Sequence, residues 1–150
     1  NPMGITVIRS PAPTTNEVQI ATRKLIGEVD AIYVPNDTTV VSALESIIKV
    51  CQDTNTPVFV GDPNRVKRGA IASVGLDYFS LGKIAGHMAA DILEGKNPGD
   101  IDAVLAYKVL TEFPVWVGTK SAEMMGVTLS PEVLASATKV IDKISSPKKH

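Results

Sequence analysis

The chain has 150 residues, 44% of them hydrophobic, which is enough for one globular domain with a substantial core but not for two full domains. Its formal net charge is −1, and no run of lysine and arginine is interleaved with aromatic residues, so nucleic acid is not expected as a partner. The single cysteine, Cys51, cannot form an intrachain disulfide, and its place in an apolar helical pattern predicts a buried hydrophobic residue.

The first part of the chain predicts alternating strands and helices. Residues 5–8 are a short apolar run typical of a strand, and a Thr-x-x-Glu capping box then begins a helix over 14–27. Residues 31–34 form another apolar run without polar alternation, as expected of a strand that is buried on both faces. Apolar residues at helical spacing predict a second helix over 38–53.

The remainder of the chain continues this alternation. Strands are expected at 58–61 and 70–74, joined by a basic connection that is too short for a full helical crossover. After Asp77, which fits an N-cap, a helix to about Gly95 carries the strongest apolar stripe of the chain. Further strands are predicted at 104–110 and 115–117, and further helices at 121–125 and 131–144.

This order of elements predicts an α/β fold, with a single domain over residues 1–150 and a mainly parallel sheet flanked by helices. In such a sheet the loops that follow the strands share one edge, so residues distant in the sequence meet in one crevice. The polar junctions expected at this edge are Ser10–Asn16, Pro35–Thr38, Gly61–Asn64 and Gly75–Tyr78. Function is therefore expected at these four junctions.

Motifs of enzyme and cofactor sites are absent from the sequence. There is no Gly-x-Ser-x-Gly nucleophile elbow and no P-loop, and Gly82 and Gly86 lie inside a predicted helix rather than in a dinucleotide-binding turn. Phosphoryl transfer to a strand-end aspartate needs a neighbouring acidic pair to hold Mg²⁺, and the first junction has none. With two histidines and one cysteine, a transition-metal site is not expected, and no cofactor is predicted.

The junctions do offer groups for a small polar ligand. Asn36 has an amide donor and acceptor, whereas Asp62 and Asp77 have acceptors for an ammonium group or a sugar hydroxyl. The N-terminus of the helix near Thr38 favours a carboxylate, so the groups together suit a small zwitterion. The alternative is structural: Asp37 or Thr38, and Asp77, would cap helices, and Asp62 with Asn64 would stabilise an Asx turn.

Several longer motifs resemble those of a known family. They are the segments Asp30–Leu44, Pro57–Asp62, Val66–Ala70, Gly75–Gly82 and Ala89–Gly95, with a similar ending over Met125–Ile141. The sequence strongly resembles ABC-transporter substrate-binding proteins, and within them the subgroup often described as tryptophan/tyrosine-binding. The resemblance covers nearly the whole chain, and its ordered series of motifs is specific.

The resemblance implies a type I periplasmic-binding-protein fold, in which two flavodoxin-like α/β lobes close on a ligand. Such a protein delivers a small solute, here one such as an aromatic amino acid, to an ABC permease in the membrane. The implied location is extracytoplasmic, either periplasmic or lipid-anchored at the outer face of the cell membrane. No catalytic role follows, because capture and release require only a closure equilibrium that ligand contacts bias.

The resemblance also assigns candidate ligand-binding residues. Asn36 and Asp62 match the polar positions that follow strands of the second lobe, and Asp77 and Tyr78 match the segment that re-enters the first lobe. Two further residues of the polar junctions, Thr15 and Asp37, complete the candidate ligand-binding set. Asp62 is expected to bind the ammonium group of the ligand, Asn36 to orient its polar part, and Tyr78 to contact an apolar side chain.

Members of this family have about two domain lengths, so we expect this chain to be a second-lobe fragment. The resemblance places residues 70–95 in a segment that crosses to the first lobe, which leaves the apolar stripe of the helix at 78–94 without its sheet. The preferred expectation is that this helix repacks as a fourth βα unit of a compact domain. The alternative is that it pairs with another chain and the protein forms a homodimer.

Two other functions share this architecture. An effector-sensing or signalling domain would have a basic DNA-binding segment upstream, whereas a signal peptide or lipobox would favour the transporter. The remaining alternative is a small flavodoxin-like enzyme, which the absence of a phosphate-binding loop weakens.

Overall fold

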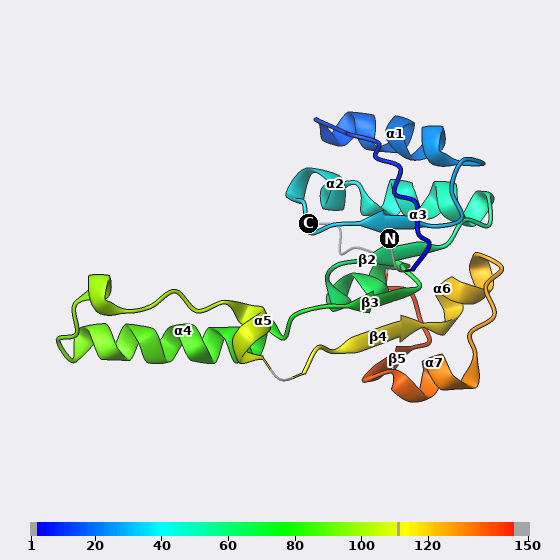
Figure 1. The fold of residues 1–150 in the computed structure, drawn as a ribbon. Coiled ribbons are helices and arrows are strands. Elements are labelled where there is room, and N and C mark those ends of the chain that lie inside the picture. The colour runs from blue at the N-terminus through cyan, green and yellow to red at the C-terminus, as the bar shows by residue number, and fades with distance from the viewer. Residues whose placement is uncertain (1–2, 111, 146–150) are drawn as a thin grey trace.

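The computed structural model describes residues 3–110 and 112–145 and shows a sheet with helices packed on it (Figure 1). Within those residues the sheet has five strands, in the spatial order β1 Ile32–Val34, β2 Val58–Val60, β3 Ala72–Val74, β4 Val115–Gly118 and β5 Lys139–Ile141. β1, β2 and β3 are parallel, β4 is antiparallel to β3, and β5 is parallel to β4. The expected α/β class with a mainly parallel sheet is confirmed.

Helices connect the strands. In chain order they are η1 Thr15–Glu17, α1 Val18–Leu25, α2 Thr38–Ser42, α3 Leu44–Asp53, η2 Pro63–Arg68, α4 Tyr78–Leu93, η3 Pro98–Asp100, α5 Ala106–Val109, α6 Thr119–Met124 and α7 Pro131–Ser136. The capping interaction expected at the first helix is present, since a carboxylate oxygen of Glu17 accepts from the backbone N–H and the hydroxyl of Thr14. The helix expected over 38–53 is divided at Ala43, whose φ of −106° and ψ of 20° leave the helical region.

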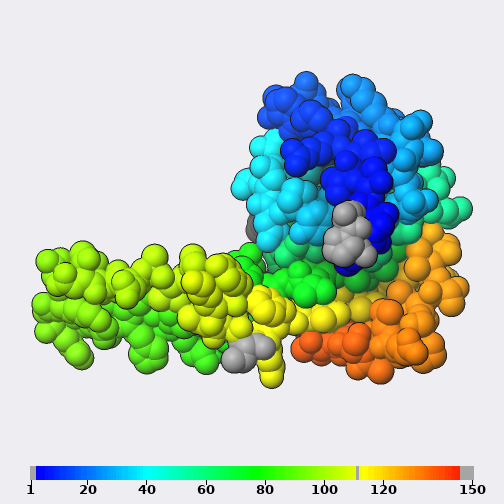
Figure 2. Space-filling model, viewed as in Figure 1, coloured from blue at the N-terminus to red at the C-terminus, as the bar shows by residue number. Residues whose placement is uncertain are grey.

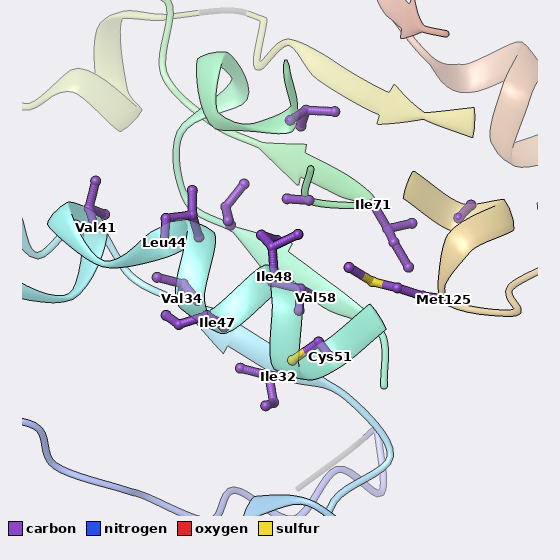
Figure 3. Packing of buried hydrophobic residues seen from close by; sticks show 14 of the residues in the cluster. Ile32, Val34, Val41, Leu44, Ile47, Ile48, Cys51, Val58, Ile71 and Met125 are labelled. Carbon is purple, nitrogen blue, oxygen red and sulfur yellow. The ribbon is translucent and has the colours of Figure 1, made fainter. Parts of the chain in front are cut away.

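The main hydrophobic cluster includes one face of strands β1 and β2. Val34, Val60 and Ser73 are partners in the strand register, so their side chains share this face, and none is more than 3% exposed. The apolar stripe of α3 belongs to the same cluster as Val34 and Val60, and Figure 3 shows it packed on the strands; the residues of this stripe are Leu44, Ile47, Ile48 and Cys51. The burial expected of Cys51 is confirmed, and burial raises the pKa of its thiol to about 11.

Three predicted elements are wrong. Residues 5–8 form no strand and lie exposed, because tertiary context rather than a local apolar run decides whether a strand forms. Residues 104–110 contain the short helix α5 in place of a strand. The helix expected over 131–144 ends at Ser136, and the chain then forms β5, which pairs with β4.

Residues 75–110 and 112–114, here called the arm, extend away from the rest of the fold (Figures 1 and 2). The remaining elements, from η1 to β3 and from β4 to β5, are called the body. α4 of the arm has no buried residue, so the expected repacking of this helix onto the sheet is wrong. β3 belongs to the sheet of the body, since it pairs with β2 and β4, and the segment expected to cross to a first lobe can therefore begin only after Val74. That the arm meets a first lobe stays a prediction.

Candidate functional site

The carboxyl ends of β1, β2 and β3 meet at one edge of the sheet because these strands are parallel. Asn36 lies at this edge, directly after β1. Its Nδ2 donates to the carbonyl oxygen of Gly61 after β2, over 3.3 Å, and to the hydroxyl of Tyr78 at the start of α4, over 3.4 Å. Three of the polar junctions are therefore joined by one carboxamide.

Asp37 and Thr15 lie on the side of α2. One carboxylate oxygen of Asp37 accepts from the backbone N–H of Val40 over 3.0 Å and so caps α2. The hydroxyl of Thr15 donates to the carbonyl oxygen of Thr39 over 3.4 Å, which places η1 beside the first turn of the same helix. Both side chains belong to exposed residues, and their hydrogen bonds show a structural role at this helix end.

Asp62 has protein partners at both carboxylate oxygens. Oδ1 accepts from the backbone N–H of Asn64 over 3.0 Å and from its side-chain amide over 3.3 Å, and Oδ2 lies 3.5 Å from Nε of Arg65. The side chain of Asp62 is 16% exposed. A ligand ammonium group at this position would share the carboxylate with Arg65, which weakens the attraction that the sequence predicted.

Asp77 caps the arm helix at the edge of a hollow. It accepts from the backbone N–H of Phe79 over 3.0 Å and from the hydroxyl of Ser80. The hydrogen bond from Ser80 holds the pKa of the Asp77 carboxyl below its ordinary value, so this group is an anion at neutral pH. The helix caps expected of Asp37 and Asp77, and the Asx turn expected of Asp62 with Asn64, are thus confirmed.

Two grooves of similar size lie near the candidate residues, and Asn36 lines neither of them. The first, of about 420 Å³, lies at the base of the arm and is lined by aromatic and acidic side chains, among them Asp77, Tyr78, Phe79, Glu112 and Trp116. The second, of about 430 Å³, lies between residues 10–13, α1 and the outer strand β1. Asp77 and Tyr78 line the first groove and Asp37 lines the second, so the candidate residues do not surround a single cavity.

Tyr33 lies beside Gly61 and was not among the predicted site residues, because residues 31–34 were expected to be buried on both faces. A Cβ atom added to Gly61 would lie 2.9 Å from the Tyr33 hydroxyl and 3.1 Å from Oδ1 of Asn36. Tyr33 is 65% exposed, whereas Ile32 and Val34 on either side of it are buried. Strand alternation was the available signal, since a tyrosine between two aliphatic residues faces the opposite side of the sheet.

The described residues offer neither a metal site nor a membrane span. Over residues 3–110 and 112–145, no three or more histidine, cysteine, aspartate or glutamate side chains gather in a way that could hold a metal ion. Among the helices of the same residues, none is long and apolar enough to cross a bilayer.

Comparison with known proteins shows relatives of greater length. A tyrosine-binding protein of Clostridioides difficile is 38% identical over 95 residues, which cover 63% of this chain and 28% of that protein. A solved conserved domain protein of Vibrio cholerae superposes with a TM-score of 0.83 at 36% identity, over 93% of this chain and 46% of the other. A Streptococcus pneumoniae ABC domain in complex with L-Trp superposes with a TM-score of 0.82 at 29% identity, over the same shares of the two chains.

The chain therefore spans less than half the length of each of these relatives. The family assignment does not depend on that length, because the match to the family includes nearly all residues of this chain. Residues 1–141 match the sequence profile of the ABC transporter substrate binding protein family, so this chain belongs to that family.

Proposed function

We propose that this chain forms one wall of the ligand cleft of an ABC importer's solute-binding component, and that the ligand is an amino acid with an aromatic side chain. The observation that carries the proposal is the carboxamide of Asn36, which joins the ends of β1 and β2 to Tyr78 of the arm. The proposal is supported by family membership and by relatives described as tyrosine-binding or solved with L-Trp.

Each candidate residue has a proposed part in binding. Asn36 orients the polar end of the ligand, since its Oδ1 is an acceptor and its Nδ2 a donor at the exposed sheet edge. Asp62 is proposed for the ammonium group, with Asp77 as the second anion near Tyr78. Tyr78 contacts the apolar side chain, while Asp37 and Thr15 fix the helix end next to Asn36. None of these parts requires a chemical step, so the proposal includes no catalysis.

The partners follow from the same proposal. The other wall of the cleft comes from a first lobe, in keeping with relatives more than twice as long as the aligned residues. The proposed membrane partner is an ABC permease, and the proposed location is extracytoplasmic. A homodimer through the exposed apolar side of α4 is proposed for the chain when no first lobe covers that helix.

An NMR titration of the 150-residue chain with single amino acids tests the ligand assignment. One wall of a cleft binds weakly, so the titration extends to ~10 mM, where a dissociation constant of about 1 mM is readily measured. L-tryptophan and L-tyrosine are expected to shift the amide signals of Asn36, Gly61 and Tyr78, and glucose and AMP are the controls. Shifts with glucose or AMP but not with any amino acid would contradict the proposal.

Light scattering tests the homodimer. At ~0.5 mM chain, a mass near twice that of the monomer is expected, and replacement of exposed Leu93 by lysine should lower it because the charge opposes burial of α4. Gly82→Ala, which adds a methyl group in open space on the same helix, is the control. A monomer at every concentration would exclude the dimer.

A further inference from the structure

The environment of Gly61 shows two tyrosines converging on one strand end. The position that a side chain of residue 61 would occupy is taken by the Tyr33 hydroxyl, at 2.9 Å, and by Oδ1 of Asn36, at 3.1 Å. The same carboxamide donates to the Tyr78 hydroxyl over 3.4 Å. One phenol thus comes from the sheet and one from the arm, and Asn36 lies near Gly61 and bonds the second of them.

Both tyrosine rings are largely exposed. Tyr33 is 65% exposed and Tyr78 is 51% exposed, although the Tyr33 hydroxyl lies against Gly61 and the Tyr78 hydroxyl is hydrogen-bonded to Asn36. A tyrosine ring has two side-chain torsions, so it offers a large rigid surface at little cost in conformational entropy. An aromatic ligand side chain gains from offset or edge contacts with such rings, whereas an aliphatic one gains from burial alone.

We infer that Tyr33 is a specificity-determining residue of this site: together with Tyr78 it contacts the planar side chain of an aromatic amino acid, and Gly61 is required because any larger residue would displace it. This inference rests on the proposed amino-acid-binding function. It assigns the preference for aromatic ligands to a residue in the middle of β1, which none of the polar junctions contains.

Substitutions at Tyr33 separate a role in specificity from a role in folding. The measured quantity is the ratio of the L-tryptophan and L-leucine affinities of the 150-residue chain, by NMR titration. Tyr33→Leu is expected to lower the L-tryptophan affinity roughly 2- to 10-fold and to leave the L-leucine affinity unchanged, since an aromatic pair contributes about that much. Tyr33→Phe keeps the ring and is expected to keep the ratio. An unchanged ratio in Tyr33→Leu would overturn the inference.

Gly61→Ala tests the same site without touching an aromatic residue. Its new Cβ atom would move the ends of two flexible side chains, Tyr33 and Asn36, so the melting temperature should change little while the affinity for both amino acids falls. Gly82→Ala, where no atom lies within 4 Å of the new Cβ, is the matched control. Wild-type affinity in Gly61→Ala would also overturn the inference.

Titration of the wild-type chain distinguishes failure of this inference from failure of the proposed function. If it binds L-tryptophan and the Tyr33 and Gly61 variants bind equally well, the inference fails and the proposed function stands. If it binds L-leucine more tightly than L-tryptophan, the aromatic assignment fails for both tyrosines. If it binds no amino acid, the proposed function fails and this inference fails with it.

Discussion

α3 of the body and α4 of the arm are both helices with an apolar stripe, but only α3 buries it. α3 has ten residues and places five of them in the interior, whereas α4 has sixteen and buries none. Figure 3 shows the stripe of α3 packed against the strands, and Figure 1 shows α4 extending from the sheet. Amphipathic spacing therefore predicted that both segments form helices, but it did not predict the surface against which each helix packs.

The ends of α4 are specified by local interactions. Asp77 accepts from the N–H of Phe79 at its start, and after its end Gly95 takes a φ of +105°, which glycine adopts without strain. Nζ of Lys96 then donates to Oδ2 of Asp91 over 3.3 Å, and the chain runs back along the helix (Figure 1). A helix of this length forms from such signals, while its position depends on a surface supplied from elsewhere.

The largest difference between body and arm is expected from removal of leucine side chains. Leu44→Ala in α3 should lower the free energy of unfolding by about 2–5 kcal/mol, because Leu44 is 0% exposed and its loss leaves a cavity. Leu93→Ala at the end of α4 should change it by less than about 0.5 kcal/mol, because Leu93 is 88% exposed. Urea unfolding followed by circular dichroism measures both. Similar losses in the two variants would show that α4 packs against the body in solution.

Glycine substitutions should act with opposite sign in the two regions. Gly69 ends η2 with a φ of +119°, and an added Cβ would lie 2.8 Å from Cγ2 of Ile48, so Gly69→Ala should destabilise the body by about 1–3 kcal/mol. Gly82 lies within α4 in open space, so Gly82→Ala should stabilise that helix by up to about 1 kcal/mol. Urea unfolding measures the first effect and amide hydrogen exchange in α4 the second. Destabilisation by Gly82→Ala would mean that something approaches this face of the helix.

The body was more predictable from sequence than the rest of the chain. The strands at 31–34 and 58–61 are short apolar runs between turn residues, and these local patterns coincide with β1 and β2. The predicted helix over 131–144 failed because residues 139–141 have partners on β4, and no local pattern reveals a distant strand. The prediction that α4 packs onto the sheet failed for the same reason, because the apolar stripe of a helix does not specify which surface the helix covers.

The site was predictable as a set of positions but not as a geometry. Parallel strands bring the residues after them to one edge, which placed Asn36 near Gly61 correctly. The sequence did not reveal that the carboxylates of Asp62 and Asp77 are already bonded within their own turns, because such bonds depend on side-chain torsions. Nor did it reveal Tyr33, whose contact with residue 61 depends on the direction of a side chain on the open face of the sheet.

A smaller effect is expected from the ion pair that connects η2 to α3. Arg68 donates to the two carboxylate oxygens of Glu45 over 2.6 and 2.7 Å, and this hydrogen bonding lowers the pKa of Glu45 below its ordinary value of 4.5. Because the Glu45 side chain is 39% exposed, Glu45→Gln should cost only about 0.5–1 kcal/mol at pH 7. No pair of this kind connects α4 to the body among the described residues.

The pH dependence of that effect has a definite sign. A carboxyl group with a lowered pKa in the folded chain stabilises it fully above the pKa of the unfolded chain, and the stabilisation is lost as the pH falls through the folded value. The difference between wild type and Glu45→Gln in urea unfolding should therefore be constant above about pH 5.5 and shrink below about pH 4.5. A difference that grew on acidification would contradict the role assigned to Arg68.

The smallest effect is expected where the two regions meet. The hydroxyl of Tyr78, at the first residue of α4, accepts a 3.4 Å hydrogen bond from Asn36 in the body, and both residues are exposed. A long hydrogen bond in contact with water stabilises little, so Tyr78→Phe should change the free energy of unfolding by less than about 0.5 kcal/mol. Its effect should instead be local: amide exchange in the first turn of α4 should become a few times faster, while exchange in α3 stays as it was. Phe79→Leu, one residue further along, keeps the bond and is the control. Equal amide exchange in the first turn of α4 in wild type and Tyr78→Phe would show that backbone contacts after β3 orient the arm. Asn36 could then bind a ligand without releasing the arm.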